Sequence, residues 1–181
     1  MTGASGLDER TGTSRAGRRY AIRMSEPGDC PAFAQLLNDV GAEGEWVIAG
    51  PGEGSVIEET VSLAALLGSG GMSLSLDVGG TVAGRVMVQR GHAAAERHAG
   101  ELAVVVAEAY RNEGMGRALI DAAVDWCRFA GVTRIALRVF TTNLRAIAVY
   151  RAAGFTEEGV LRRAVLVAGG DRDLVVMSRL L

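Results

Sequence analysis

The residues Arg111-x-x-Gly114-x-Gly116 lie between an apolar run, Leu102 to Val106, and a segment with helical periodicity. Glycines let a ligand approach the main chain closely, and bare amides at a helix N-terminus, helped by the helix dipole, bind anions such as a pyrophosphate. Arg111 and Arg117 add positive charge beside this turn. The pattern therefore predicts an anion-binding turn, although a strand-to-helix turn that needs only positive φ values would also use glycine.

Two well-known nucleotide-binding loops are excluded by the residues around these glycines. A phosphate-binding loop of the Walker type ends in Gly-Lys-Ser/Thr, but every one of the 19 basic residues is arginine. A dinucleotide-binding loop needs a third glycine three residues after the second, and this position is Leu119.

Composition narrows the class of protein further. A chain of 181 residues with 49% hydrophobic and 22% charged residues predicts one soluble globular domain. The net charge of -2 and the pI of about 5.7 argue against a nucleic-acid partner. We expect no membrane segment and no signal segment, no metal site, and a cytoplasmic protein in which Cys30 and Cys127 are reduced thiols.

Periodicity predicts an alternation of strands and helices after a tail. Residues 1–18 are rich in Gly, Ser, Thr and Arg and are expected to be a disordered tail before a domain at 19–181. A mixed α/β sheet is predicted, with strands at 20–24, two around Gly79-Gly80, 101–107, 134–140, 155–167 and 174–180, and helices at 31–40, 55–68, 114–130 and 143–154.

Two motifs in this order resemble those of the GNAT superfamily, the acetyl-CoA-dependent N-acetyltransferases. "VVVAEAYRNEGMGRALI" resembles the family's Arg/Gln-x-x-Gly-x-Gly/Ala signature, and "RIALRVFTTNLRAIAVYRAAGFTEEG" resembles its Asn-x-x-Ala-x-x-x-Tyr-x-x-x-Gly-Phe motif. The second motif is closest to the branch of ribosomal-protein N-terminal and bacterial amino-acid N-acetyltransferases. The resemblance implies a single-domain α/β (α+β) fold, with a largely antiparallel central sheet that has a splayed edge and about four flanking helices.

The same resemblance implies where acetyl-CoA binds. The main chain of Val104, Val105 and Val106 would pair with the pantetheine arm like an added strand. Asn143 would bond the pantetheine or cap its own helix, and Arg151 would touch a phosphate or be solvated. The amides expected around the pyrophosphate are those of Arg111, Asn112, Glu113, Gly114, Met115, Gly116 and Arg117.

Tyr150 occupies the position of the family's usual general acid, two helical turns after Asn143. Glu101, at the start of the strand that carries the cofactor, is the expected general base, directly or through water, and is otherwise a solvated strand-end residue. His92 or His98 in the preceding loop could serve instead.

The turn departs from the family pattern at two places. Glu113 puts a carboxylate inside the phosphate turn, where it either weakens anion binding or caps the helix. Glu108 or Ala109 stands in place of a proline that often follows the strand.

The acceptor is not identified by these motifs. Glu43, Glu45 and Trp46 lie in a long Gly-rich loop and suit a cationic amine, but they equally fit a solvated loop. Three functions are left open: acetylation of a small-molecule primary amine such as an amino acid, acetylation of a protein or peptide N-terminus, and a non-catalytic acetyl-CoA-binding module. A homodimer is left open too, since members of this superfamily often dimerise.

Overall fold

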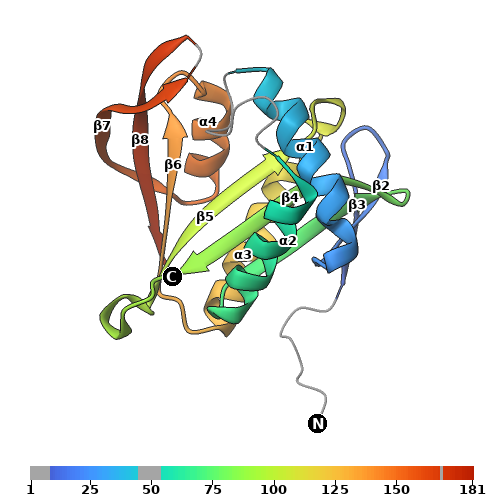
Figure 1. Ribbon diagram of the computed structural model, residues 1–181, viewed down its shortest axis with the longest axis horizontal. Coiled ribbons are helices and arrows are strands. Elements are labelled where there is room, and N and C mark those ends of the chain that lie inside the picture. The colour runs from blue at the N-terminus through green and yellow to red at the C-terminus, as the bar shows by residue number, and fades with distance from the viewer. Residues whose placement is uncertain (1–8, 45–53, 168) are drawn as a thin grey trace.

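The computed structural model describes residues 9–44, 54–167 and 169–181 (Figure 1). Within these residues the strands form one sheet in the order β1-β2-β3-β4-β5-β6-β8-β7. The strands are β1 (Arg10–Thr13), β2 (Arg19–Met24), β3 (Met72–Val78), β4 (Thr81–Arg90), β5 (Ala99–Val106), β6 (Arg134–Phe140), β7 (Thr156–Val167) and β8 (Gly170–Leu180). The helices are α1 (Cys30–Ala42), α2 (Val56–Gly68), α3 (Met115–Phe129) and α4 (Leu144–Ala152), with 3-10 turns at Pro27–Asp29, Ala94–Glu96 and Glu108–Tyr110.

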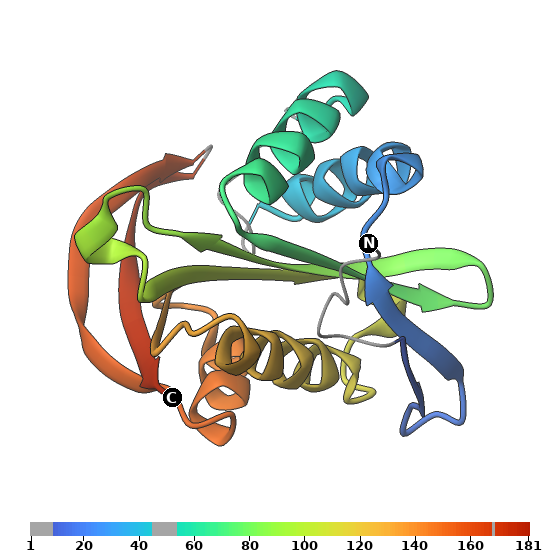
Figure 2. The ribbon, with the colours of Figure 1, turned by 90° about the horizontal axis from the view of Figure 1, so that it is seen from below.

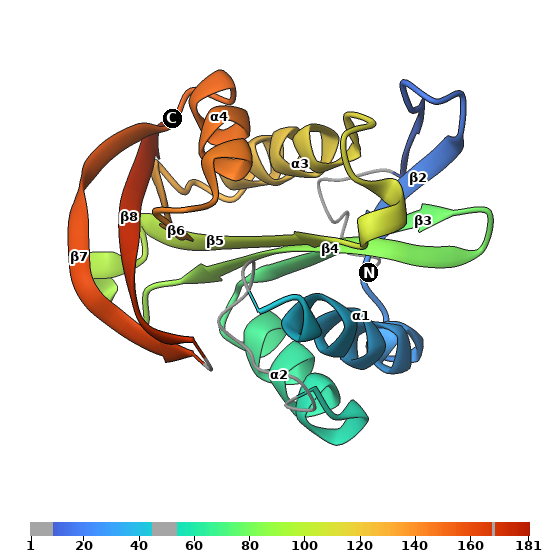
Figure 3. The same cartoon turned by 90° about the horizontal axis from the view of Figure 1, so that it is seen from above.

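The sheet is covered by helices on both faces. α1 and α2 lie on one face and α3 and α4 on the other, and the part of the sheet made by β6, β8 and β7 stands at an angle to the rest (Figures 2 and 3). All neighbouring strands are antiparallel except β5 and β6. The prediction of a mixed, largely antiparallel, splayed sheet with about four helices is confirmed.

The splay lies between β5 and β6. Among the described residues these strands pair only over Ala99–Glu101 and Arg134–Ala136, although β5 continues to Val106 and β6 to Phe140. Beyond Glu101 the two strands diverge, and the side of β5 that faces away from β4 has no neighbouring strand. The gap is therefore inside the sheet rather than at its outer edge.

The predicted disordered tail is wrong for the residues that follow position 8. Arg10–Thr13 forms β1, which pairs antiparallel with β2 in the register Arg10↔Ile22 to Thr13↔Arg19. This segment has no apolar periodicity, and it is fixed instead by polar contacts with distant residues, including Arg10 to Asp125 at 2.9 Å. Residues 1–8 lie outside the described residues.

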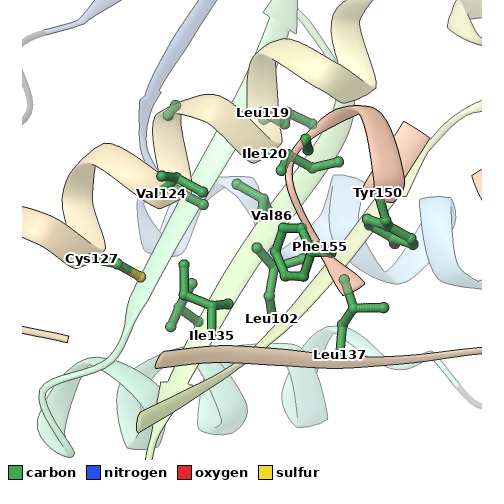
Figure 4. Packing of buried hydrophobic residues seen from close by; sticks show 14 of the residues in the cluster. Val86, Leu102, Leu119, Ile120, Val124, Cys127, Ile135, Leu137, Tyr150 and Phe155 are labelled. Carbon is green, nitrogen blue, oxygen red and sulfur yellow. The ribbon is translucent and has the colours of Figure 1, made fainter. Parts of the chain in front are cut away.

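Apolar packing fixes α3 and the start of the splayed region. Leu119, Ile120 and Val124 of α3 belong to one buried cluster with Val86 of β4 and Leu102 of β5 (Figure 4). Such close-packed interiors transmit strain and hold backbone positions. The cluster therefore holds the strand that leads into the glycine turn and the helix that leaves it. Among the described residues, no helix has the length and apolar character needed to cross a membrane.

A polar cluster attaches the helices of the opposite face. Arg85 of β4 is 3% exposed, and its Nη1 donates to Glu59 of α2 at 2.5 Å while its Nε donates to Ser73 Oγ at 2.8 Å. Its guanidinium lies 4.1 Å from the ring centroid of Phe33 in α1. Arg85 Nη2 is buried and has no partner among the described residues. One buried cation thus holds α1 and α2 against the sheet.

Glu59→Gln should lower the free energy of unfolding by about 3 kcal/mol, because the buried Arg85 charge then has no anion beside it. Urea denaturation measures the change. The matched control is Glu96→Gln at an exposed position, which should shift stability by less than about 0.5 kcal/mol. Equal effects of the two substitutions would contradict a structural role for this ion pair.

Candidate active site

A cavity of about 600 Å³ opens where β5 and β6 diverge. It is bounded by β5, by the glycine turn, by the end of α1, by β6 and by the start of α4. Its lining includes Arg15, Leu37, Val40, Glu101, Leu102, Ala103, Val104, Val105, Val106, Arg111, Asn112, Gly114, Gly116, Arg117, Ile120, Arg138, Val139, Phe140, Asn143, Arg145, Ala146, Val149, Tyr150 and Leu174. Most of the residues predicted for the site are therefore brought together in one place.

The β5 wall of the cavity presents main chain. Val104, Val105 and Val106 line it, and their ladder partners lie on the β4 side only. Main-chain groups left free on one side of a strand accept an extended ligand as an additional strand. The Val106 carbonyl is already used, because Arg111 Nε donates to it at 2.8 Å.

The two glycines of the turn have different reasons to be glycine. Gly114 is the N-cap of α3 with φ 93°, a conformation that favours glycine. Gly116 lies inside α3 without a positive φ, and a Cβ there would meet nothing closer than Val106 Cγ2 at 3.7 Å. Neither backbone conformation nor the protein's own packing requires this glycine, whereas a ligand that approaches the main chain closely would require it.

The first turn of α3 can hold an anion. Its N-cap, Gly114, has no side chain to bond the helix amides, so among the described residues the amides of the first turn have no side-chain cap. Uncapped amides at the positive end of a helix dipole suit phosphate oxygens. The residues present therefore fit a diphosphate group at this turn.

Arg111 works mainly within the protein. Its Nη1 and Nη2 donate to the Glu43 carboxylate at 2.6 and 2.7 Å, so the arginine joins the end of α1 to the end of β5. Glu43 was predicted to bind the acceptor, but it holds Arg111 and does not line the cavity. Glu45 and Trp46, predicted for the same role, lie outside the described residues.

The side chains of Glu113 and Met115 point away from the cavity. Glu113 accepts a hydrogen bond from Ser14 Oγ at 2.6 Å and lies 3.3 Å from Arg18 Nε. Met115 is fully buried in the core. The charge of the Glu113 carboxylate is partly compensated by Ser14 and Arg18, and the Glu113 carbonyl accepts from the Arg15 amide.

Arg117 lines the cavity and is also tied to its surroundings. Its Nε contacts Asp121 at 2.9 Å and its Nη1 donates to the Ala152 carbonyl at 2.6 Å. Arg151, predicted to reach a phosphate, is not part of the lining and pairs with Glu157. It follows Tyr150 by one position, so it points about 100° away around the helix.

Tyr150 and Asn143 both reach the cavity from α4. Asn143 is the N-cap, accepting from the Ala146 amide at 3.0 Å, and is also part of the lining. Tyr150 is 7% exposed and packs edge-on against Phe155, with ring centroids 5.9 Å apart (Figure 4). No described group hydrogen-bonds its hydroxyl, and burial raises the pKa of Tyr150 to about 12. The phenol therefore holds its proton throughout the neutral range.

Glu101 stands at the point where the strands part, beside a residue that sequence reasoning missed. Arg138 of β6 places both Nε and Nη2 at 2.8 Å from Glu101 Oε1, and both side chains line the cavity. The parallel register pairs Glu101 with Ala136, which puts Arg138 two residues further on the same face. Arg138 alternates with the buried residues Ile135, Leu137 and Val139, so the sequence pattern alone indicates only an outward side chain and not its neighbour across the gap.

Other candidate groups lie elsewhere. His92 and His98 are exposed and do not line the cavity. Arg15 and Arg145 do line it, although neither was predicted to. In the described parts of the chain, no three His, Cys, Asp or Glu residues come together as they would to hold a metal ion.

Comparison with known proteins gives the same family. The model of the Acetyltransferase (GNAT) family matches residues 45–155. The ribosomal protein bS18-alanine N-acetyltransferase of Escherichia coli (strain K12) is 33% identical over 69 residues, 38% of this chain and 47% of that protein. The L-amino acid N-acetyltransferase AaaT of the same organism is 29% identical over 103 residues, 56% of this chain and 64% of that protein. The alignments thus span less than two thirds of either relative.

A solved structure shares the fold. The GNAT superfamily phosphinothricin acetyltransferase of Sinorhizobium meliloti, in complex with acetyl-CoA, superposes with a TM-score of 0.83 at 21% identity, covering 90% of this chain and 88% of that one. The family model covers more than half of the chain, across the glycine turn and the Asn143–Tyr150 helix. The protein belongs to the GNAT family of acetyltransferases.

Proposed function

We propose that this protein transfers an acetyl group from acetyl-CoA to the primary amine of a small molecule, an amino acid or a related metabolite. Acetyl-CoA would supply an acetyl group activated as a thioester. The observation that carries the proposal is the convergence, in one cavity, of the free edge of β5, the uncapped first turn of α3 and the buried phenol of Tyr150. The phosphate end of the cofactor would lie at the first turn of α3, and its sulphur-bearing end would lie near β5 and Tyr150.

The binding residues act mostly through the main chain. Val104, whose main-chain groups alternate with those that face β4, would offer free peptide groups to the pantetheine arm. The amides from Gly114 onward would receive the diphosphate. Asn143 Oδ1 accepts the capping hydrogen bond from the Ala146 amide, and the residue also lines the cavity. Binding through peptide groups fixes the position of the thioester without requiring a particular side chain.

Proton transfer is assigned to two side chains. Tyr150 Oη carries a proton at neutral pH and would give it to the departing sulphur. Glu101, which lines the cavity while His92 and His98 do not, would accept the amine proton, directly or through water. The outer carboxylate oxygen, Oε2, is the one for this step, because both contacts of Arg138 fall on Oε1.

An amino acid matches the charges at the mouth of the cavity. Glu101 and Arg138 present an anion and a cation side by side, and an amino acid brings an ammonium group and a carboxylate at a similar spacing. Arginine binds carboxylates in a two-pronged geometry. A peptide N-terminus is the second candidate, and the name of the bS18-acetylating relative favours it. A purely binding function leaves the buried, protonated Tyr150 without a role.

The proposal includes a cytoplasmic location and a homodimer. Cys30 and Cys127 are unpaired and buried, which supports a cytoplasmic, reducing environment. β7 is one of the two outer strands of the sheet, with Val160 and Leu161 more than 40% exposed, and such edges can pair with other chains. This supports the homodimer.

Tyr150→Phe should lower kcat by roughly 100- to 10,000-fold, because the leaving sulphur loses its proton donor. Acetylated product is followed by mass spectrometry with a panel of amino acids. Affinity for acetyl-CoA should be unchanged: a hundredfold excess over Kd should stabilise wild type and variant alike by about 2.7 kcal/mol in a thermal melt.

The matched control for this substitution is Tyr20→Phe, which removes a hydroxyl outside the cavity. It should leave both kcat and the melt unchanged. Equal turnover of wild type and Tyr150→Phe would remove Tyr150 from the mechanism. A melt that does not respond to acetyl-CoA would overturn the proposed function itself.

Ultraviolet titration of the native protein should show a tyrosinate transition near the pKa of about 12 of Tyr150, and this transition should be missing from Tyr150→Phe. The sign follows from burial, which favours the neutral phenol. Unfolded tyrosine ionises near pH 10, so the native state loses stability as pH rises above that value. Circular dichroism defines the range in which the protein is folded. A Tyr150-dependent transition below about pH 10 would contradict the burial argument.

Arg138→Gln should raise KM for amino acids by roughly tenfold through loss of one charged hydrogen-bonded contact, and should spare KM for acetyl-CoA. The corresponding amino-acid amides, which lack the carboxylate, should show no such change. Arg134→Gln is the control, because Arg134 lies on the same strand but outside the cavity and pairs with Glu158. Equal losses for acids and amides, or rates that rise with peptide length, would favour a peptide acceptor.

A further inference from the structure

The turn between β1 and β2 is docked on the glycine turn. The Arg15 amide donates to the Glu113 carbonyl at 3.0 Å, and Ser14 Oγ donates to the Glu113 carboxylate at 2.6 Å. Arg18 adds an ion pair to the same carboxylate at 3.3 Å and lies 5.1 Å from the ring centroid of Tyr110. Main chain and side chain of Glu113 therefore both hold this hairpin in place.

Docking of the hairpin puts Arg15 at the anion-binding turn. Arg15 lines the cavity, and its Nε lies 3.9 Å from the position that a Cβ on Gly114 would occupy. Gly114 is the N-cap of the helix whose first-turn amides have no cap. A guanidinium thus stands beside the amides that suit a diphosphate.

Arg15 differs from the other arginines of the turn in its partners. Arg111 is held by Glu43, and Arg117 by Asp121 and the Ala152 carbonyl. Within the described part of the chain, the Arg15 side chain makes no hydrogen bond or ion pair, while its own main chain is fixed. A positioned cation with its donors unused is suited to a ligand that brings the anion.

We propose that Arg15 binds the pyrophosphate of the cofactor from the β1–β2 hairpin, and that Glu113 is the residue that positions this hairpin. The inference rests on the proposed function for the identity of the ligand. It also gives Glu113 a role in anion binding that its negative charge alone would not suggest. Glu113 supports anion binding indirectly: its carboxylate contacts Ser14 and Arg18, and these contacts hold the hairpin that carries Arg15.

Isothermal titration calorimetry with CoA tests the assignment without relying on turnover. Arg15→Gln should raise Kd for CoA by roughly tenfold, as expected for one lost charged hydrogen-bonded contact. Arg19→Gln is the matched control: it removes the same charge from the same hairpin, outside the cavity, and should leave Kd unchanged. Thermal melts without ligand verify that both variants are folded.

The choice of ligand identifies the phosphate. Dephospho-CoA lacks the 3′-phosphate and keeps the pyrophosphate, so the Arg15→Gln effect should persist with it. S-acetylpantetheine has no phosphate, so its Kd should not respond to Arg15. An effect that disappears with dephospho-CoA would overturn the assignment to the pyrophosphate, and an effect that persists with S-acetylpantetheine would overturn any phosphate contact.

Glu113→Gln separates positioning from simple electrostatics. Removing a negative charge near the phosphates would by itself tighten CoA binding, whereas loosening the hairpin weakens it. We expect weaker binding, and no further loss when Glu113→Gln is added to Arg15→Gln, because both act through one contact. Tighter binding, or independent additive effects, would overturn the positioning role.

These experiments distinguish a failure of the role of Arg15 from a failure of the proposed function. If wild type binds CoA but Arg15→Gln and Arg19→Gln bind it equally well, the role of Arg15 is overturned and the proposed function stands. If wild type binds neither CoA nor dephospho-CoA, the proposed function and the role of Arg15 both fall.

Discussion

The parting of β5 and β6 after three residue pairs is the constraint on which the site depends. On its strand-free side β5 presents main-chain groups that no neighbouring strand pairs with. Each strand is held on its other side: β5 pairs with β4 along most of its length, and every residue of β6 pairs with β8. The sheet can therefore stay open at this point without losing either half, which leaves room for an extended ligand beside β5.

The loops around the gap are arranged by arginines. Arg111 bridges the Val106 carbonyl and the Glu43 carboxylate, which connects β5 to α1. Arg18 connects the N-terminal hairpin to Glu113. A guanidinium presents several donors in a fixed plane, so one side chain can hold two acceptors from different elements, which a lysine ammonium does with less geometric control. In a chain without lysine, positive charge near the cavity is therefore also structural.

Local spacing was sufficient to predict the glycine turn, because Gly114 and Gly116 follow from the strand-to-helix junction. Asn143 and Tyr150 were expected from the family resemblance, and both line the cavity. The side chains of Arg111, Glu113 and Arg151 were assigned less well, because their directions depend on partners far along the chain. Glu113 contacts Ser14, 99 residues away, and no periodicity in a polar, Gly-rich segment indicates that this segment is folded.

The same distinction explains why the acidic residues of the site were misread. If the Glu113 carboxylate faced the cavity, it would repel an anionic ligand. If the Glu43 carboxylate faced the cavity, it would bind a cationic amine. Both instead face arginines of the protein. Their charges are compensated locally, so the net field at the cavity is set by the helix dipole and by cations that remain unpaired. Affinity for an anionic cofactor in this protein thus depends less on how many acids and bases surround the turn than on which arginines already have a partner.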